Sequence, residues 1–266
     1  MGASISDQSL RAMERYTHGH AASVVSQHGA RTVEDSAQFL LPFLRPHVKL
    51  LDVGCGPGSI TRGFASRVSS VVGVDSSAEV IATAKAKAAE RDSEEDETFD
   101  VVFAHQLLQH LSEPLRALQE MRRVCKAGGL VAAREVAYST MQGAPVLPGL
   151  HRWREVYMMT ARRNGGEPDA GLYLKKWMNS AGFTSLRFTT STVTHSDSGT
   201  DAAAAKRFFG ESWATRTLET FGPQAVAFGF CSAGELDEMA AAWRSWAQDS
   251  SATFVYVNGE VVAEKT

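Results

Sequence analysis

The fold is decided by a short apolar run that ends in alternating glycines: Val48-Lys49-Leu50-Leu51-Asp52-Val53-Gly54-Cys55-Gly56-Pro57-Gly58. The apolar part predicts a buried strand, and the glycines predict a sharp turn at its end. Because glycine has no side chain, the backbone of this turn can approach a ligand closely. A helix expected from Ser59 to about Arg67 would add its N-terminal amides. The stretch therefore predicts a strand–turn–helix binding site.

Strand and helix patterns alternate after this stretch. Apolar runs over 70–75, 99–104 and 130–136 predict further strands. The clearest helix starts at Ser112-Glu113-Pro114, turns Leu115, Leu118, Met121 and Cys125 inward, and is closed by Gly128-Gly129. Strands that alternate with helices at this spacing predict right-handed βαβ units. We therefore expect an α/β fold with a doubly wound, mostly parallel, Rossmann-like sheet.

The pattern changes at both ends of this core, and we expect one domain in three parts. Residues 1–46 should form an N-terminal helical lid and residues 47–138 the ligand-binding core. Residues 139–266 should add helices that shape a substrate pocket and strands that complete the same domain. Strands are expected over 186–194 and 253–262, the latter as a strand or a hairpin. The aromatic and methionine side chains of two C-terminal helices are interpreted mainly as core, with a pocket wall as the alternative for the first four: Trp153, Tyr157, Met158, Met159, Trp243 and Trp246.

The composition is that of a globular protein that acts on something small. The chain has 266 residues, 44% hydrophobic and 21% charged, with a formal net charge of −3. The slightly acidic balance argues against a nucleic-acid partner. No run approaches the ~20 apolar residues of a membrane span, and the first residues lack the apolar region of a secretory signal. Cys55, Cys125 and Cys231 form no close pair and no metal-ligand cluster, so we expect a cytoplasmic protein without a metal and leave its oligomeric state open.

A carboxylate at the end of the next strand indicates the ligand class. Asp75 follows Asp52 by 23 residues, at the place where open α/β folds hold an acid against a ribose diol. This geometry predicts an adenosine-containing ligand. The dinucleotide fingerprint is not met, because Ser59 stands where its last small residue belongs, and the absence of a lysine after the loop excludes a Walker-type phosphate site. Asp52 suits a ligand that bears an ammonium group and no phosphate.

These segments resemble the class I S-adenosylmethionine-dependent methyltransferases. Residues 50–58 look like motif I of that family, and residues 72–75 resemble its ribose-binding segment. The segment from Phe99 to Leu111 resembles the strand-four region of the branch that includes ubiquinone-biosynthesis-like enzymes, and the helix over 113–129 is similar too. Tyr16-Thr17-His18-Gly19-His20 looks like the N-terminal segment that covers the cofactor in microbial and fungal members. The resemblance implies S-adenosylmethionine as the cofactor.

The resemblance also implies a set of cofactor-binding residues. The motif I residues would cradle the methionine end: Asp52, Gly54, Cys55, Gly56 and Gly58. Asp75, with Ser76 beside it, would hold the ribose hydroxyls. Ala104, His105 and Gln106 would lie beside the methionine and the substrate pocket, and Tyr16 and His20 would cover the cofactor. Cys55 itself is interpreted as a small buried filler, because nothing near it in sequence would activate a nucleophile.

The chain departs from the family between Asp75 and Phe99. The family places another strand and an acidic or polar loop there, which lies against adenine, whereas this chain has only 23 residues, used by a helix and the acidic run 92–97. We therefore expect the strand over 71–75 to be a sheet edge. Lost contacts to adenine would weaken cofactor binding about 10–100-fold. A natural deletion, a truncated gene model and a spliced variant explain the gap equally well.

The predicted reaction is methyl transfer to O, N or C of a small, apolar or aromatic metabolite. The alternative is a protein of this fold with an impaired cofactor site, which acts as a binding module or catalyses a reaction without methylation. A nicotinamide-dependent oxidoreductase is disfavoured by the glycine spacing. A base is needed only if the nucleophile loses a proton as it attacks, and the candidates are His105, His110 and His20. For each of them, a hydrogen-bonding or wall histidine is the favoured interpretation.

Overall fold

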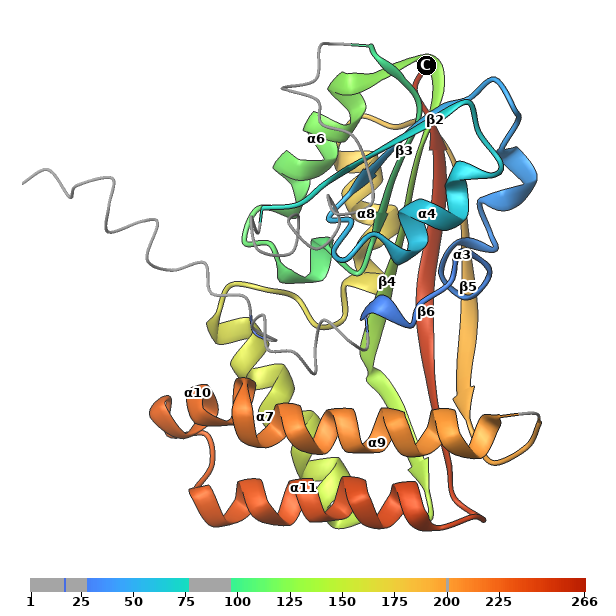
Figure 1. Ribbon diagram of the computed structural model, residues 1–266. Helices are drawn as coiled ribbons and strands as arrows, with labels where there is room; N and C mark the ends of the chain where they lie inside the picture. The colour runs from blue at the N-terminus through green and yellow to red at the C-terminus, as the bar shows by residue number, and fades with distance from the viewer. Residues whose placement is uncertain (1–16, 18–27, 77–96, 200) are drawn as a thin grey trace, which may run out of the picture.

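In a computed structural model of the protein, the described residues form one six-stranded sheet (Figure 1). The structure describes residues 17, 28–76, 97–199 and 201–266. Tyr16, His20, the expected helix after Ser76 and the acidic run up to Asp96 lie outside the described residues. No described helix is long and apolar enough to cross a membrane.

Four strands form the parallel part of the sheet. They are β1 (Lys49–Val53), β2 (Ser70–Val74), β3 (Phe99–His105) and β4 (Cys125–Ala144). Strand β1 pairs in parallel with β2 and β3, and β3 pairs in parallel with β4. The last two strands, β5 (Ser185–His195) and β6 (Thr253–Glu264), pair antiparallel with each other, and β6 also pairs antiparallel with β4. The order β2-β1-β3-β4-β6-β5 confirms the predicted fold class.

Of the two alternatives predicted for residues 253–262, the strand is confirmed, because β6 is paired along its length with β4 and β5. One boundary differs from the prediction. Strand β4 begins at Cys125, which was expected on the preceding helix, and its pairing with β3 shifts register between Cys125 and Leu130. The shift includes Gly128, at φ 74°. Gly128-Gly129 therefore lie within an irregular strand start and do not close the helix.

Helices cover both faces of the parallel part. Helices α6 (Pro114–Val124) and α8 (Ala170–Ser180) pack on one face, where Val102 and Val131 belong to their core. On the other face, α3 (Val33–Ala37) and α4 (Ser59–Ala65) cover a second core that includes the neighbouring Val101 and Ala132. Adjacent strand residues thus point to opposite cores, as the pleat of a strand requires. Between Arg31 and Pro46 the expected lid helix is reduced to α3 and the short 3-10 helix Leu41–Phe43.

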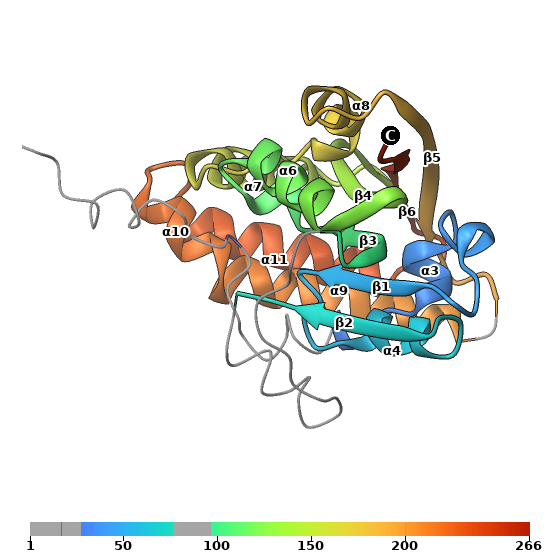
Figure 2. The same ribbon diagram turned by 90° about the horizontal axis from the view of Figure 1, so that it is seen from above.

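A third layer of helices lies beyond the ends of the parallel strands. Strands β4, β5 and β6 run on past the parallel part and meet the layer made of α7 (Pro148–Arg163), α9 (Ala202–Glu219), α10 (Phe221–Ala227) and α11 (Ala233–Gln248) (Figures 1 and 2). Its core is aromatic, and Trp153, Tyr157, Trp243 and Trp246 are at most 1% exposed. Their interpretation as core is confirmed.

Candidate functional site

The glycine turn lies at the end of β1, between β2 and β3. Gly54 and Gly56 have positive φ values of 73° and 53°, a conformation that favours glycine. A Cβ atom on Gly54 would stand 2.9 Å from the Leu107 side chain, so this residue must be small to fit against the segment after β3. A Cβ atom on Gly56 would meet nothing within 4 Å, so space for a ligand is open above it. The turn therefore has one packed side and one open side.

The end of β2 brings the predicted ribose acid against this turn. Gly54 and Cys55 donate their backbone N–H groups to the carbonyl oxygen of Val74, at 2.8 and 3.0 Å. The backbone N–H of Gly56 donates to Oδ2 of Asp75 at 3.0 Å. Ser76 is exposed at the same strand end. The fold thus places the two separate sequence signals, glycine turn and carboxylate, in direct contact.

Asp52 lies beneath the turn. It is 3% exposed, and its Oδ2 accepts a hydrogen bond from the Thr61 hydroxyl at 2.6 Å. Burial and the nearby Asp75 raise the pKa of Asp52 to about 7, although the Thr61 bond acts in the opposite direction. Burial likewise raises the pKa of the Cys55 thiol to about 12, which fits the interpretation of Cys55 as a filler. Asp52 therefore connects the end of β1 to α4, the helix that follows the turn.

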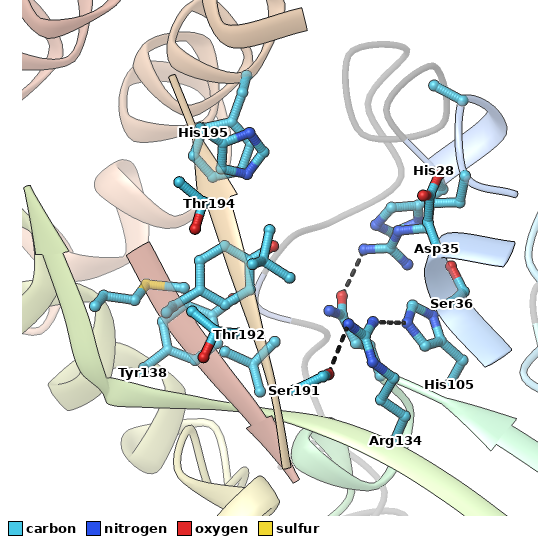
Figure 3. A pocket seen from close by; sticks show the side chains of 18 of the residues that line it. His28, Asp35, Ser36, His105, Arg134, Tyr138, Ser191, Thr192, Thr194 and His195 are labelled. Carbon is cyan, nitrogen blue, oxygen red and sulfur yellow. Dashed lines mark hydrogen bonds between the residues drawn. The ribbon is translucent and has the colours of Figure 1, made fainter. Parts of the chain in front are cut away.

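A cavity of about 580 Å³ opens on the other side of the β3 end (Figure 3). His105, Gln106 and His110 line it, so three of the predicted residues lie together. Ala104 does not line it, since its side chain is fully buried in the α6–α8 core. Further walls come from β4, β5, β6, α9 and the segment around α3. The cavity therefore lies between the parallel part of the sheet and the third helical layer.

One end of the cavity is a network of charged and polar side chains that sequence reasoning missed. Arg134 of β4 pairs with Glu260 of β6 at 3.1 Å, and these side chains are 8% and 10% exposed. Arg134 also lies 3.1 Å from Nε2 of His105, and Ser191 donates to Glu260 at 2.6 Å. Arg31 donates to the side-chain oxygen of Gln106 at 2.5 Å. Four elements of the fold therefore meet at this polar end.

The protonation of His105 follows from this network. An arginine has only donors, so Nε2 of His105 accepts from Arg134 and the ring proton resides on Nδ1. Burial, Arg31, Arg134 and His28 hold the pKa of His105 well below its usual value. Burial, Arg31 and Arg216 lower the pKa of His110 to about 3. Both rings are neutral at pH 7, and the available lone pair of His105 is already used by Arg134.

The opposite end of the cavity is aromatic. It is lined by Tyr138, Met141, Phe209, Trp213 and Tyr256. Tyr138 stacks on Tyr157 with ring centroids 4.4 Å apart, and this pair connects the wall to the core of the third layer. His195 stacks on Phe209 at 3.8 Å, and burial lowers the pKa of His195 to about 4. This end suits an apolar or aromatic body.

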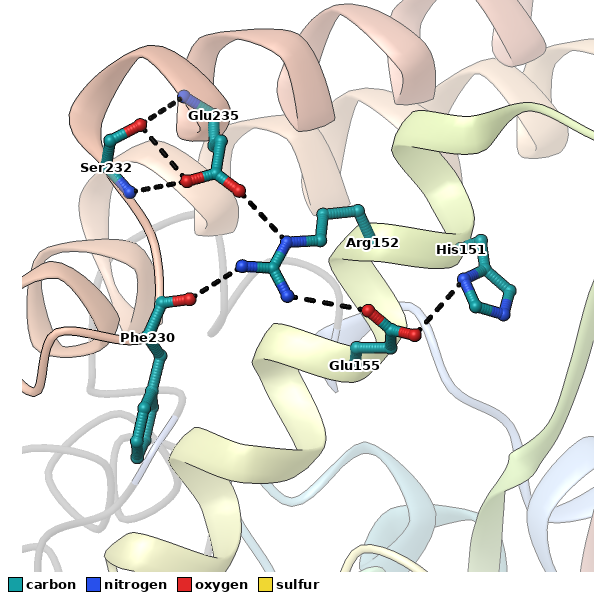
Figure 4. Close-up of polar contacts among 6 residues, drawn as sticks. All are labelled: His151, Arg152, Glu155, Phe230, Ser232 and Glu235. Atoms are coloured by element: carbon teal, nitrogen blue, oxygen red, sulfur yellow. Dashed lines mark hydrogen bonds and ion pairs between the residues drawn. The ribbon is translucent and has the colours of Figure 1, made fainter.

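Polar contacts fix the helices behind the aromatic wall (Figure 4). Helix α11 begins with a capping box in which the Ser232 and Glu235 side chains accept from each other's backbone N–H groups. Arg152 of α7 donates to Glu235 at 3.0 Å and to the carbonyl oxygen of Phe230 at 2.7 Å. Thr17 of the predicted covering segment is buried against Asn164, which donates to its hydroxyl at 3.0 Å.

Glu135 is a further residue that sequence reasoning missed. It is fully buried beside Arg134, and its carboxylate accepts from the backbone N–H groups of Leu107, Leu108 and Gln109 at 2.9, 2.7 and 3.3 Å. Burial raises its pKa to about 8 against the effect of these three bonds. Glu135 therefore anchors the segment after β3 that forms the packed side of the glycine turn. The available signal was the charged pair Arg134-Glu135 inside an apolar strand run. No group of three or more metal-ligating side chains occurs within the described ranges.

Comparison with known proteins agrees with this geometry. The methyltransferase domain family matches residues 51–133. An uncharacterized methyltransferase of Schizosaccharomyces pombe is 29% identical over 94% of this chain and 96% of its own length. The "Probable methyltransferase ltbC" of Aspergillus luteorubrus is 37% identical over 45% of this chain and 51% of its own length. The structure of the YcgJ protein from Bacillus subtilis has the same fold, with a TM-score of 0.52 at 15% identity, over 87% of this chain and 98% of that one.

Proposed function

We propose that this chain, which belongs to the class I S-adenosylmethionine-dependent methyltransferases, methylates O, N or C of a small, apolar or aromatic metabolite. The observation that carries the substrate class is the cavity of about 580 Å³ beside the β3 end, with a polar end at His105 and Arg134 and an aromatic end at Tyr138 and Phe209. A pocket of this size and mixed lining is typical of small-molecule sites. The proposal also keeps residues 1–46 as a lid and residues 139–266 as the part that shapes the pocket.

The described residues fit S-adenosylmethionine. The cofactor supplies a methyl group that its sulfonium already activates. The open side of the turn at Gly56 and the adjoining carboxylate of Asp75 would hold its methionine and ribose parts. Asp52 would act from beneath, through the conformation of the turn. Cys55 would fill space in the turn and take no part in the chemistry, because burial keeps its thiol protonated.

Because the methyl group is already activated, the chain mainly has to position the acceptor and exclude water. The polar end of the cavity would orient the reacting group toward the end of β3, while the aromatic end holds the rest of the molecule. His105 would act here as a neutral wall residue and not as a base, since Arg134 occupies its Nε2 lone pair. His110, also neutral, would line the same wall.

Calorimetry with S-adenosylmethionine tests the cofactor assignment. We expect micromolar binding by the wild-type chain and a loss of about 10–100-fold or more in Asp75→Ala, because hydrogen bonds to a charged group contribute about 1.5–3 kcal/mol. Glu211→Ala is the matched control, since Glu211 is an exposed acid of α9 outside the cavity. An unchanged affinity in Asp75→Ala would remove Asp75 from the site. No binding at millimolar cofactor would support the impaired-site alternative, which the outer position of β2 among the described strands favours.

A further inference from the structure

We propose that Asn258, in the floor of the cavity, binds a carboxamide or lactam of the acceptor through both polar atoms of its side chain. This inference rests on the proposed function and narrows its substrate class. The acceptor's apolar or aromatic body would carry a neutral amide, bound between the polar end and the aromatic end of the cavity. Asn258 belongs to β6, the strand between β4 and β5, and would select the acceptor without taking part in the methyl transfer.

The sheet directs Asn258 toward the cavity. Residues two apart on a strand share a face, so Asn258 lies on the face of Tyr256 and Glu260, which both line the cavity. Its direct partners across the two ladders are Val136 of β4 and Ser191 of β5, and these line the cavity as well. Four lining residues thus surround Asn258 on one face of the sheet, which places it in the middle of the floor.

Both polar atoms of the Asn258 side chain lack a partner. The residue is 0% exposed, and neither Nδ2 nor Oδ1 forms a hydrogen bond within the part of the chain that the structure describes. The polar neighbours bind one another instead: Ser191 donates to Glu260 at 2.6 Å, and Arg134 pairs with Glu260 and lies 3.4 Å from the Ser191 hydroxyl (Figure 3). A buried amide without partners costs stability, and proteins retain such groups mainly at functional sites.

The two atoms of the amide specify the class of group that would bind. Nδ2 donates and Oδ1 accepts, and they stand side by side, so the matching group presents an acceptor next to a donor. A carboxamide or a lactam does so without charge. A carboxylate only accepts and an ammonium group only donates, so either would leave one atom of Asn258 unpaired and would place a charge in a covered site. A neutral amide therefore fits.

Tyr256 is the neighbour that would admit the amide. Because Asn258 is fully covered, a ligand reaches it only when a surrounding side chain turns aside. Ser191 and Glu260 are held by the hydrogen bond between them. The partly exposed Tyr256 has no side-chain hydrogen bond to any described residue, so its ring is the one that moves at the smallest cost.

Calorimetry with two phenols of matched shape tests the inference. They are 4-hydroxybenzamide and 4-isopropylphenol, in which an isopropyl group replaces the amide, and each is titrated into the full chain saturated with S-adenosylhomocysteine. We expect the amide to bind at least about tenfold more tightly, although the isopropyl compound is the more hydrophobic. N,N-Dimethyl-4-hydroxybenzamide, which keeps the oxygen but has no N–H donor, should lose most of this advantage.

Asn258→Leu should reverse the preference, because leucine has a similar volume and no polar atom in its side chain. The melting temperature should stay the same or rise, since the change removes a buried amide that has no partner. Selectivity is then lost without a loss of stability, which a merely structural asparagine would not show. The matched control is Asn179→Leu, at an exposed position of α8, which should leave the preference unchanged.

Three results would overturn the inference: equal or weaker binding of 4-hydroxybenzamide by the wild type, no binding of either phenol at millimolar concentration, or an unchanged preference in Asn258→Leu. Each is read in protein whose binding of S-adenosylhomocysteine is measured separately by calorimetry. Loss of that binding would count against the proposed function, whereas intact binding with any of the three results counts against the amide site alone. The wild-type comparison of the three probes decides the question even if Asn258→Leu does not fold.

Discussion

The glycine turn at 54–58 and the cavity beside it are built by different means. The turn consists of consecutive residues, and its shape depends on backbone conformation. Its contact to a residue farther along the sequence is the hydrogen bond from Gly56 to Asp75. The cavity is assembled from side chains that lie as far apart in sequence as Arg31 and Glu260, and it depends on the buried Arg134–Glu260 pair and on aromatic packing. The first kind of site can be recognised from a motif, whereas the second exists only after folding. Variants of the two regions should therefore fail in different ways.

The largest effect is expected at the buried pair of the cavity. Arg134→Met leaves Glu260 buried with no cation beside it in the described wall, which should lower the free energy of unfolding by about 3–5 kcal/mol. Denaturant unfolding measures this loss. The double variant Arg134→Met/Glu260→Leu should recover most of it, because it removes both charges. A single variant that loses less than about 1 kcal/mol would mean that the pair is not desolvated.

The second-largest effect is expected at Asp52, whose contribution to the free energy of unfolding should depend on pH. The pKa of Asp52 is raised in the folded chain to about 7, so the folded state binds a proton that the unfolded state has released. The stability from this group is therefore present near pH 4 and is lost as the pH rises toward 7. Asp52→Asn, which stays neutral, should gain stability relative to wild type between about pH 5 and 8, by on the order of 2–4 kcal/mol. The lowered pKa values of the histidines act in both proteins and cancel in this difference. A constant difference across this range would show that Asp52 is ionised in the fold.

A matched pair of glycine variants separates the packed and open sides of the turn. Gly54→Ala combines a positive φ with a contact to Leu107, and should cost about 1–3 kcal/mol of stability. Gly56→Ala has the positive φ but no contact, so it should cost less stability and should lower the affinity for S-adenosylmethionine more. Thermal unfolding and calorimetry on both variants measure the two effects. Equal loss of affinity in both would contradict the assignment of the open side to the ligand.

The smallest effect is expected at the outer wall of the cavity. Phe208 lines the cavity and is 44% exposed, so Phe208→Ala should change stability by less than about 1 kcal/mol. It should raise the KM for an aromatic acceptor by up to about tenfold and leave cofactor affinity unchanged. Phe228→Ala is the control, because Phe228 is similarly exposed on α10's C-cap and lies outside the cavity wall. An unchanged KM would place the acceptor deeper in the cavity, away from Phe208.

The parallel part of the fold could be predicted from the sequence because its signals are local. The apolar runs that end at Val53 and Val74 are short and bounded by turn residues, and they became β1 and β2. Glycines near Cys125 resembled a helix end, but the pairing of Cys125 with Phe99 made them part of a strand. Only the sheet as a whole decides between these two local possibilities.

The cavity could be predicted only in part, because most of its contacts join residues that lie far apart in the sequence. His105 and Gln106 follow a recognisable strand, so their position near a site was readable. Arg134 and Glu260 sit in two strands far apart in sequence, and their pairing follows from the β4–β6 register. Glu135, one residue along, points to the opposite side and binds three backbone amides there. Nothing in the order of residues indicates which acid of such strands meets which partner.

The course of β4 along the cavity sets the distance between the polar end and the aromatic end. Arg134 and Tyr138 stand four residues apart on this strand, roughly 13 Å at ~3.3 Å per residue, and pairing with β6 holds this length from Arg134 to Ala137, just before the register shift that includes Tyr138. The helices across the cavity can change its width by substitution of single side chains, but they cannot change this length. We therefore expect related enzymes with the same strand to accept molecules that differ in width but share a similar distance between their reacting group and their apolar end.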